Sequence, residues 1–409
     1  MKQKKTIVIT AMITCLSTLV LVYGGFVVYR SPYVTQLSSA LKGEYSETSV
    51  QRIADIIDNY YYEDVDEEKI YKGAIKGMID ALNDEYSAFV DEEEYQSLMS
   101  DLSGEFKGIG VQVSIDDEDG LITVIAPIED TPAYRAGIKT GDKIIAVNGI
   151  PVGLDNYGEA IEMMRGSEED ETDDVKITLV RRETGNTEDI TVTREVIVTK
   201  SVKSRLLDGN VGYIRITNFD ENTAADFAQH LDILGAEKLD GMVIDLRGNP
   251  GGIIDTTHEI ADMLLPKGMF VYFEYKDGSR EEYKCDDEYY DFPLAVIVNG
   301  GSASASEAFA GAVKDTGRGV LVGEKTFGKG VVQTIMPFMY TENGNTAVKL
   351  TTSRYFTPKG HCIHGQGLNP DIEVEPNPET EGMTYTQISL ENDPQLKAAW
   401  DHVTQLIRQ

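Results

Sequence analysis

The sequence has little cysteine and no paired metal-binding or redox cysteines. Its 409 residues include three cysteines and no C-x-x-C pair, which excludes a zinc knuckle and a dithiol redox motif. Cys15 falls in an apolar N-terminal segment. Cys285 and Cys362 would form one disulfide in an oxidising compartment, although two free thiols are the favoured alternative.

Positive charge is also scarce. The 37 Lys and Arg residues are outnumbered by 69 Asp and Glu residues, which gives a formal net charge of -32. Such a surface repels nucleic-acid phosphates and gains nothing from counterion release, so no nucleic-acid partner is expected. Hydrophobic residues make up 41% of the chain, which excludes low-complexity disorder and predicts two or three globular domains.

Charge is entirely absent from residues 6–29. As a helix this segment spans ~36 Å, enough to cross a hydrocarbon layer of ~30 Å. Lys2, Lys4 and Lys5 precede it, and such residues stay on the cytoplasmic side. We expect an uncleaved anchor that leaves residues 31–409 outside the cytoplasm. A cleaved signal peptide is the alternative, disfavoured because no clear small-x-small exit site follows.

Residues 31–102 are predicted to be helical. The stretches "ETSVQRIADIIDNYY" and "KIYKGAIKGMIDAL" repeat apolar residues at spacings of three and four. A further short helix in "DEEEYQSLMSDL" has Asp91 as its expected N-cap. Because this segment buries little core alone, we expect it to pack on later domains or on a second copy, which leaves a homodimer open.

A period of two begins near Gly104, in "GIGVQVSI", "LITVIAPI" and "DKIIAVNGIPV". These strands resemble a PDZ domain, and "TPAYRAGIKTGDKIIAVNGIPV" is similar to that family's short helix, turn and strand. In this family an extended peptide adds a strand to a sheet edge. The resemblance implies that the backbone N–H groups of Gly108, Ile109 and Gly110 receive the carboxylate of a peptide C-terminus. The other interpretation is a small β-barrel that serves only as a spacer between other domains.

After Lys200, strands alternate with helices, which predicts an α/β core with a mainly parallel sheet. "GMVIDLRGNPGG" predicts a strand that ends in a glycine-rich turn, and "LAVIVNGGSASASEAFAGAVKD" a buried strand, a turn and a helix. Ser302, Ser304 and Ser306 lie at that turn. A serine there either projects into a cleft beside the helix N-terminus or simply caps the helix, and "SASE" fits a capping box.

A serine nucleophile needs a base, and none of the five histidines, which are His230, His258, His361, His364 and His402, lies in a hydrolase motif. Lysine serves when desolvation lowers its pKa. Lys329 in "VGEKTFGKGVVQ" lies between two glycines and near apolar residues. The same stretch nearly matches a phosphate-binding loop, but Gly330 stands where a Ser or Thr would hold magnesium, so nucleotide binding is not expected.

Four stretches together resemble the carboxyl-terminal processing peptidases, which are serine proteases with a Ser–Lys dyad. They are "GEFKGIGV", "DLRGNPGG", "NGGSASASEAFAGAVKDTGRGVLVGEKTFGKGVVQ" and "SRYFTPKG", in that family's order. The resemblance implies that Ser304 is the nucleophile, Lys329 the general base and Gln333 the residue that orients the lysine. It also implies an oxyanion hole from the backbone N–H groups of Ala305 and Gly251, with Gly252 next to the latter.

The expected fold is an α/β protease core, crotonase-like or ClpP-like with a ββα sheet, that carries an inserted PDZ domain, a helical N-terminal segment and one transmembrane helix. The expected domains are a cytoplasmic tip and anchor, a helical region, the PDZ domain, the protease core and a helical tail. Their boundaries are 1–30, 31–102, 103–198, 199–378 and 379–409.

The expected function is membrane-anchored endoproteolysis of protein C-termini or unfolded segments outside the cytoplasm, without cofactor or metal. We further expect the PDZ domain to gate the cleft, with Arg165 as a charged latch. His361, Cys362 and His364 offer a metal site as a less favoured alternative. The rival functions are a non-catalytic PDZ binding protein and a related enzyme that acts on acyl thioesters.

Overall fold

The computed structural model describes residues 45–116, 119–128, 130–166, 172–341, 344–380, 383 and 385–408. These residues form two compact units that divide between Phe89 and Val90. The predicted anchor at residues 6–29 lies outside the described residues. Within the described ranges, no helix combines the length and the apolar composition needed to cross a bilayer.

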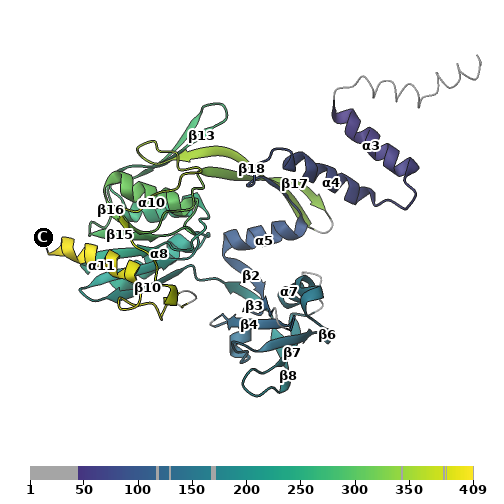
Figure 1. Ribbon diagram of the computed structural model, residues 1–409, viewed down its shortest axis with the longest axis horizontal. Helices are drawn as coiled ribbons and strands as arrows, with labels where there is room; N and C mark the ends of the chain where they lie inside the picture. Colours follow the sequence, from purple (N-terminus) through teal and green to yellow (C-terminus); the bar gives the residue numbers. More distant parts are fainter. Residues whose placement is uncertain are drawn as a thin grey trace, which may run out of the picture. The chain divides into compact units, whose positions relative to one another are not determined.

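The first unit contains the predicted helices α3 (Glu47–Tyr60) and α4 (Glu67–Asp80) (Figure 1). The side chain of Asp66 caps α4 by accepting the N–H of Lys69. Neither helix buries any residue, and apolar side chains such as Ile53 and Met78 are more than half exposed. The apolar periodicity therefore forms helices here without forming a core.

The second unit begins, after β1 (Ala88–Val90) at the junction, with α5 (Glu92–Ser103). Asp91 caps α5 as predicted: its carboxylate accepts the N–H of Glu94, and the Glu94 carboxylate accepts the N–H of Asp91. The helix ends at Gly104, whose φ of 68° is left-handed.

The PDZ segment follows as a small antiparallel domain. Its main sheet has the order β3-β4-β5-β7-β8, with β6 beside β5, and a separate pair is formed by β2 and β9. The elements are β2 (Glu105–Gly108), β3 (Val111–Ile115), β4 (Ile122–Pro127), α6 (Pro132–Arg135), β5 (Lys143–Val147), β6 (Ile150–Pro151), η1 (Leu154–Asn156), α7 (Tyr157–Arg165), β7 (Asp174–Val180), β8 (Thr187–Thr193) and β9 (Glu195–Val198).

The core is a sheet of order β10-β11-β12-β15-β16-β19 in which every pair except β10–β11 is parallel. This confirms the predicted α/β organisation. The strands and helices are β10 (Val202–Leu207), β11 (Val211–Ile216), α8 (Thr223–Leu234), η2 (Ala236–Lys238), β12 (Gly241–Asp245), α9 (Ile254–Leu264), β15 (Leu294–Val298), α10 (Ala305–Thr316), β16 (Gly319–Gly323) and β19 (Ile372–Glu373).

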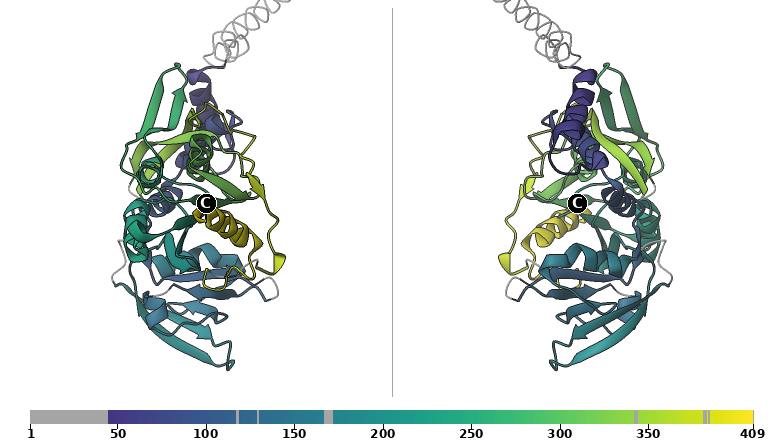
Figure 2. Two further views of the ribbon diagram at one scale, coloured as in Figure 1. Left: turned by 90° about the vertical axis from the view of Figure 1, so that its left-hand side faces the viewer. Right: turned by 90° about the vertical axis from the view of Figure 1, so that its right-hand side faces the viewer.

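Alternate residues of the central strands pack on opposite faces of this sheet. On one face Ile244 and Val296 belong to the core formed with α8, α9 and α10. On the other face Val243 and Ala295 contact the cluster that includes α11 (Pro394–Ile407), which follows η3 (Pro378–Thr380). Figure 2 shows α11 in yellow, near the C-terminus. Two layers of helix on a fully buried sheet explain the continuous apolar runs in the sequence.

A second, antiparallel sheet was not predicted in full. Its strands include β13 (Gly268–Tyr275), β14 (Arg280–Cys285), β17 (Val331–Thr341) and β18 (Gly344–Phe356). β18 pairs with both β17 and β13, and β13 pairs with β14. The sequence predicted only the C-terminal part of β18. The turn between β13 and β14 contains Asp277 and Gly278, a pair typical of hairpins, so its signal was present.

Candidate active site

Ser304 occupies the tight turn between β15 and α10. Its backbone angles are φ 54° and ψ -117°, and a positive φ is uncommon for a residue with a side chain. The turn is held on both sides of the residue. The Ser304 N–H donates to the Glu307 carboxylate at 3.0 Å, and its carbonyl accepts the Tyr355 hydroxyl at 2.8 Å. The sequence thus places a serine on a strained strand-to-helix turn, as nucleophiles of hydrolases are placed.

The two predicted oxyanion residues lie against this serine. A Cβ atom built on Gly251 would come within 2.8 Å of the Ser304 Cβ and 2.9 Å of the Ala305 nitrogen. Gly251 also has φ 104°, so both its backbone and its surroundings favour glycine. In this structure, however, the Gly251 N–H donates to Asn249 Oδ1 at 2.9 Å. The Gly251 N–H therefore already has an acceptor, a contact that the sequence did not reveal.

Lys329 has the electrostatics of a base. Burial lowers the pKa of its amine, and the positive charge of Lys349 lowers that pKa further, while the Glu307 carboxylate opposes both effects. A lysine whose pKa is lowered holds more of its neutral form near neutral pH, and only the neutral amine accepts a proton.

Glu307 is the functional residue that the sequence analysis missed. One of its oxygens accepts the N–H of Ser304 at 3.0 Å and the N–H of Lys329 at 2.8 Å. The other oxygen accepts the N–H of Gly328 at 2.8 Å and the Thr326 hydroxyl at 2.5 Å. This fully buried carboxylate thus joins the backbone of Ser304 to that of Lys329.

Burial raises the pKa of Glu307, whereas its hydrogen bonds to Thr326, Lys329, Gly328 and Ser304 lower that pKa. The signal in the sequence was the S-x-x-E pattern. It was interpreted as a capping box, and the half in which the carboxylate accepts the Ser304 N–H is present. The additional contacts to the lysine loop depend on a segment 20 residues away and could not be seen in a local pattern.

Gln333 lies on β17 opposite Thr351 of β18, and its amide donates to the Thr351 hydroxyl at 3.2 Å. Its predicted role, the orientation of Lys329, stays a prediction.

The glycines that flank Lys329 pack against the segment of residues 361–367. A Cβ atom on Gly330 would lie 2.5 Å from the His364 nitrogen, and the Gly365 N–H donates to the Gly328 carbonyl at 2.8 Å. These glycines therefore allow a close backbone approach within the protein, which accounts for the resemblance to a phosphate loop without a phosphate.

The remaining candidate ligands in this region do not converge. Across the described ranges, no group of three or more His, Cys, Asp or Glu residues is arranged to hold a metal ion. Cys285 and Cys362 are both free thiols. Burial, together with the nearby charges of Asp262 and Asp286, raises the pKa of the Cys285 thiol to about 12.

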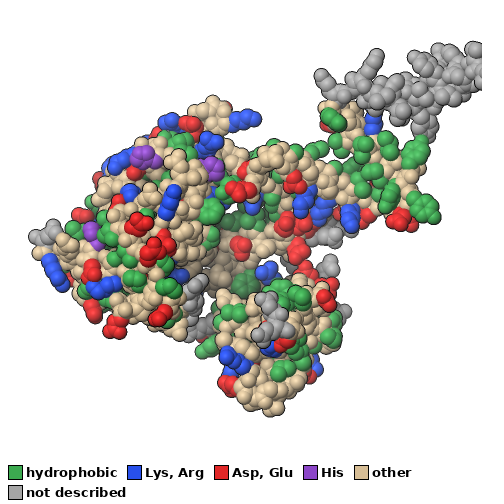
Figure 3. All heavy atoms as spheres, in the orientation of Figure 1, with side chains coloured by type: hydrophobic (Ala, Val, Ile, Leu, Met, Phe, Trp, Pro, Cys, Tyr) green, Lys and Arg blue, Asp and Glu red, His purple; other side chains and the backbone are tan. Residues whose placement is uncertain are grey.

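The predicted peptide-binding residues Gly108, Ile109 and Gly110 connect β2 to β3. They line a cavity of about 820 Å³ that also borders Tyr157, Ile161, Met164 and Arg165 of α7. The same cavity reaches Pro250, Gly251 and Gly252 of the turn after β12. The cavity thus extends from the turn at residues 108–110 to the turn that packs on Ser304. Acidic side chains are scattered over the face of the molecule in Figure 3.

Three sequence models match the chain in order. They are the activating protease CtpB N-terminal domain at residues 30–94, a PDZ domain at 123–173 and peptidase family S41 at 210–374. The S41 segment contains Ser304, Lys329 and Gly251.

Curated relatives are similar over most of the chain. The carboxy-terminal processing protease CtpA of Bacillus subtilis is 37% identical over 371 residues, which cover 90% of this chain and 76% of that protein. CtpB of the same organism is 34% identical over 331 residues, which cover 80% and 67% respectively. A solved structure described as a candidate S41 protease of Bacteroides fragilis has a TM-score of 0.55 at 16% identity, covering 89% of this chain and 99% of that one, and so supports the fold alone.

These matches agree with the geometry around Ser304 and argue against both a binding protein without catalysis and an acyl-thioester enzyme. The chain belongs to the S41 family of carboxyl-terminal processing proteases and is a serine-type peptidase with a PDZ domain.

Proposed function

We propose that this protease uses Ser304 and Lys329 as its catalytic dyad and cleaves protein substrates that its PDZ domain captures by a C-terminus or an unfolded segment. The observation that carries the assignment is the Glu307 oxygen that binds both the Ser304 and the Lys329 N–H groups. It holds the two backbones together across a segment of 25 residues. Burial of the Lys329 amine supports its role as the base.

In the proposed mechanism, neutral Lys329 takes the hydroxyl proton of Ser304, and the serine oxygen attacks the substrate carbonyl. The N–H groups of Ala305 and Gly251 stabilise the oxyanion. The C–N bond then breaks as the lysine gives its proton to the departing amine. In the second half, Lys329 takes a proton from water as the water oxygen attacks the acyl carbonyl. Lys329 then gives this proton to the Ser304 oxygen as the ester C–O bond breaks, which releases the acid product and restores the neutral lysine. No metal or organic cofactor enters these steps.

The cavity supports capture by the PDZ domain. Its PDZ end combines the glycine-rich turn at residues 108–110 with apolar side chains of α7, which suits an apolar residue next to a free carboxylate. Arg165, at the end of α7, also lines the cavity and is our candidate for a charged latch.

We propose that the PDZ domain gates the protease. Gly251 must leave its hydrogen bond with Asn249 before its N–H can serve an oxyanion. The Gly251 carbonyl accepts the Phe219 N–H at 2.9 Å, and the loop around Phe219 contacts the PDZ entry, where the Glu221 N–H donates to the Leu102 carbonyl at 2.9 Å. One loop thus contacts both the PDZ entry and the oxyanion turn. If deletion of residues 104–196 left peptide turnover and substrate dependence unchanged, gating would be wrong.

We also propose that residues 6–29 anchor the protein and that its catalytic part lies outside the cytoplasm. The uncharged segment and the preceding lysines support this orientation. The orientation is tested by the accessibility of introduced cysteines to an impermeant reagent in intact cells, since labelling only after lysis would contradict the proposal.

A homodimer is supported by the exposed apolar faces of α3 and α4. Light scattering of residues 31–409 tests this oligomeric state.

The dyad is tested with residues 31–409 as wild type, Ser304→Ala and Lys329→Ala. Each is incubated with a loosely folded protein that ends in apolar residues, and the products are identified by mass spectrometry. Cleavage by the wild type alone is expected, with a loss of about 10⁴-fold or more in either variant. Cleavage by all three proteins would show that another nucleophile or a contaminant acts.

A further inference from the structure

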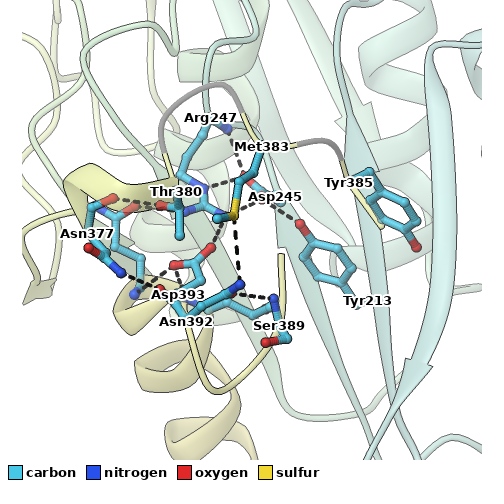
Figure 4. Close-up of polar contacts among 12 residues, drawn as sticks. Tyr213, Asp245, Arg247, Asn377, Thr380, Met383, Tyr385, Ser389, Asn392 and Asp393 are labelled. Atoms are coloured by element: carbon cyan, nitrogen blue, oxygen red, sulfur yellow. Dashed lines mark hydrogen bonds and ion pairs between the residues drawn. The ribbon is translucent and has the colours of Figure 1, made fainter. Parts of the chain in front are cut away.

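The C-terminal helix begins at a buried ionic cluster that includes Arg247, four residues before Gly251 (Figure 4). Arg247 Nη2 lies 2.7 Å from Asp393 Oδ2, and Nη1 donates to Gln395 Oε1 at 2.9 Å. Both partners belong to the start of α11. They therefore connect the C-terminal tail to the turn that packs on Ser304.

The cluster is almost free of solvent. Asp245 is 0% and Asp393 2% exposed, and the Arg247 side chain is 13% exposed. The Arg247 guanidinium also donates two hydrogen bonds to Asp245, at 3.0 and 2.7 Å, and the Arg247 backbone N–H donates a third at 3.0 Å. The Tyr213 hydroxyl donates to Asp245 at 2.6 Å. Burial alone would lower the pKa of Arg247, but the two carboxylates raise it, so the guanidinium is charged. Buried charges with several partners resist displacement, because loss of a partner leaves a charge without compensation.

The segment that follows Arg247 is bonded to the nucleophile turn. The Asn249 carbonyl accepts both the Ala303 N–H and the Ser306 hydroxyl at 3.0 Å. The Ser302 hydroxyl donates to the Leu246 carbonyl at 2.7 Å. A shift of Arg247 would therefore be transmitted to residues on either side of Ser304.

The partners of Arg247 differ in whether they can hold the turn in place relative to the start of α11. Asp245 lies two residues earlier, at the end of β12, so it holds Arg247 without fixing the turn relative to the tail. Asp393 is itself fixed, because its other oxygen caps α11 by accepting the N–H groups of Gln395 and Leu396 at 3.0 Å. Gln395 is fixed as well, since its amide donates to the Val374 carbonyl at 2.8 Å.

We propose that Asp393 and Gln395 are positioning residues for the oxyanion turn and act through Arg247. The inference rests on the proposed function, in which Gly251 supplies an oxyanion donor. Both residues lie beyond residue 374, where the match to peptidase family S41 ends. The C-terminal helix is thus part of the apparatus that sets the geometry of catalysis.

The test compares three single substitutions at the start of α11, each made in the full chain of 409 residues. Asp393→Ser keeps an oxygen that caps the helix but is too short to reach Arg247. Asp393→Asn keeps the cap and a neutral acceptor for Arg247. Gln395→Met removes the second contact. The matched control is Val403→Ala, which loosens the same helix at a buried position and has no polar contact with Arg247.

The readouts are kcat and KM on one peptide, the thermal midpoint, and the affinity of a peptide aldehyde that adds to Ser304. We expect Asp393→Ser to lower kcat and aldehyde affinity about tenfold or more with KM nearly unchanged, and Gln395→Met to have a smaller effect of the same kind. Asp393→Asn should recover most of the loss. Val403→Ala should lower the thermal midpoint without changing kcat by more than about twofold.

An unchanged kcat in Asp393→Ser would overturn the inference. A fall in kcat no larger than that of Val403→Ala would also overturn it, if the two variants have the same thermal midpoint. Failure of the proposed function gives a different result, because aldehyde affinity would then be equal in wild type and Ser304→Ala. If Asp393→Ser does not fold, Gln395→Met decides the question by the same comparison with Val403→Ala.

Discussion

The proposed nucleophile–base pair and the proposed oxyanion turn are held by different kinds of contact. Ser304 and Lys329 share one buried acceptor, Glu307, whose oxygens bind N–H groups from both loops. The turn at residues 246–251 is bonded instead to the nucleophile turn, to the loop around Phe219 and, through Arg247, to the start of α11. The contacts of Ser304 and Lys329 therefore form a local unit, whereas the turn at residues 246–251 is bonded to elements spread over the second unit.

Among substitutions outside the Ser304–Lys329 pair, the largest predicted effect comes from removing the acceptor that the two loops share. Glu307→Ala leaves three N–H groups without their acceptor, at a cost of about 1–3 kcal/mol for each that remains buried. We expect loss of activity by about 1000-fold and a large fall in the denaturation midpoint. Glu307→Gln should lose less activity and less stability, because one oxygen remains as an acceptor. Measurement of kcat and of urea unfolding for both variants tests this order.

Glu237→Gln on the surface is the matched control and should behave as wild type. Equal activity of Glu307→Ala and wild type would show that the dyad does not depend on this carboxylate.

The next effect acts on the oxyanion turn. In Gly251→Ala the new methyl would lie 2.8 Å from the Ser304 Cβ at a backbone φ of 104°, so the turn must move away from the nucleophile. We expect kcat to fall about 100-fold while the dyad remains folded. Gly158→Ala, in open space on α7, is the control and should be neutral or stabilising. A kcat near that of the wild type in Gly251→Ala would remove this residue from the oxyanion hole.

The smallest effect concerns the base. Because burial and Lys349 lower the pKa of Lys329, kcat should rise with pH through a pKa below the usual lysine value of 10.5. Lys349→Gln removes one of the causes, so the pKa of Lys329 rises and the rising limb moves to higher pH. A pH–rate profile of wild type and variant measures the shift. Lys238→Gln, which removes a distant charge, should leave the profile in place; an equal shift in both would assign the effect to net charge.

Local patterns predicted the parts of the molecule that local forces determine. The buried runs at residues 241–245 and 294–298 gave the central parallel strands, and Asp91 gave the start of α5. The strand-turn-helix at Ser304 was also visible in the sequence. The β13–β14 hairpin was overlooked although its turn carried a signal.

Other features could not be predicted because they join distant residues. The contact of Arg247 with Asp393 spans 146 residues, and no local sequence pattern around either residue predicts its contact with the other. The Gly251 N–H is bound by Asn249 only two residues earlier, yet its orientation depends on the packing of the whole turn. Glu307 was visible as a cap, but its bonds to the lysine loop require the completed fold.

The separation of Asp393 from Arg247 has a consequence for the order in which the enzyme matures. A chain is synthesised from its N-terminus, so Ser304 and Lys329 leave the ribosome before Asp393 and Gln395 exist. On the inference above, a nascent protease that already has its nucleophile and base still lacks the contacts that set its oxyanion turn. A chain stopped at residue 390 should accordingly show little turnover of the test peptide. The newly made protein would then acquire its proteolytic activity only as α11 docks.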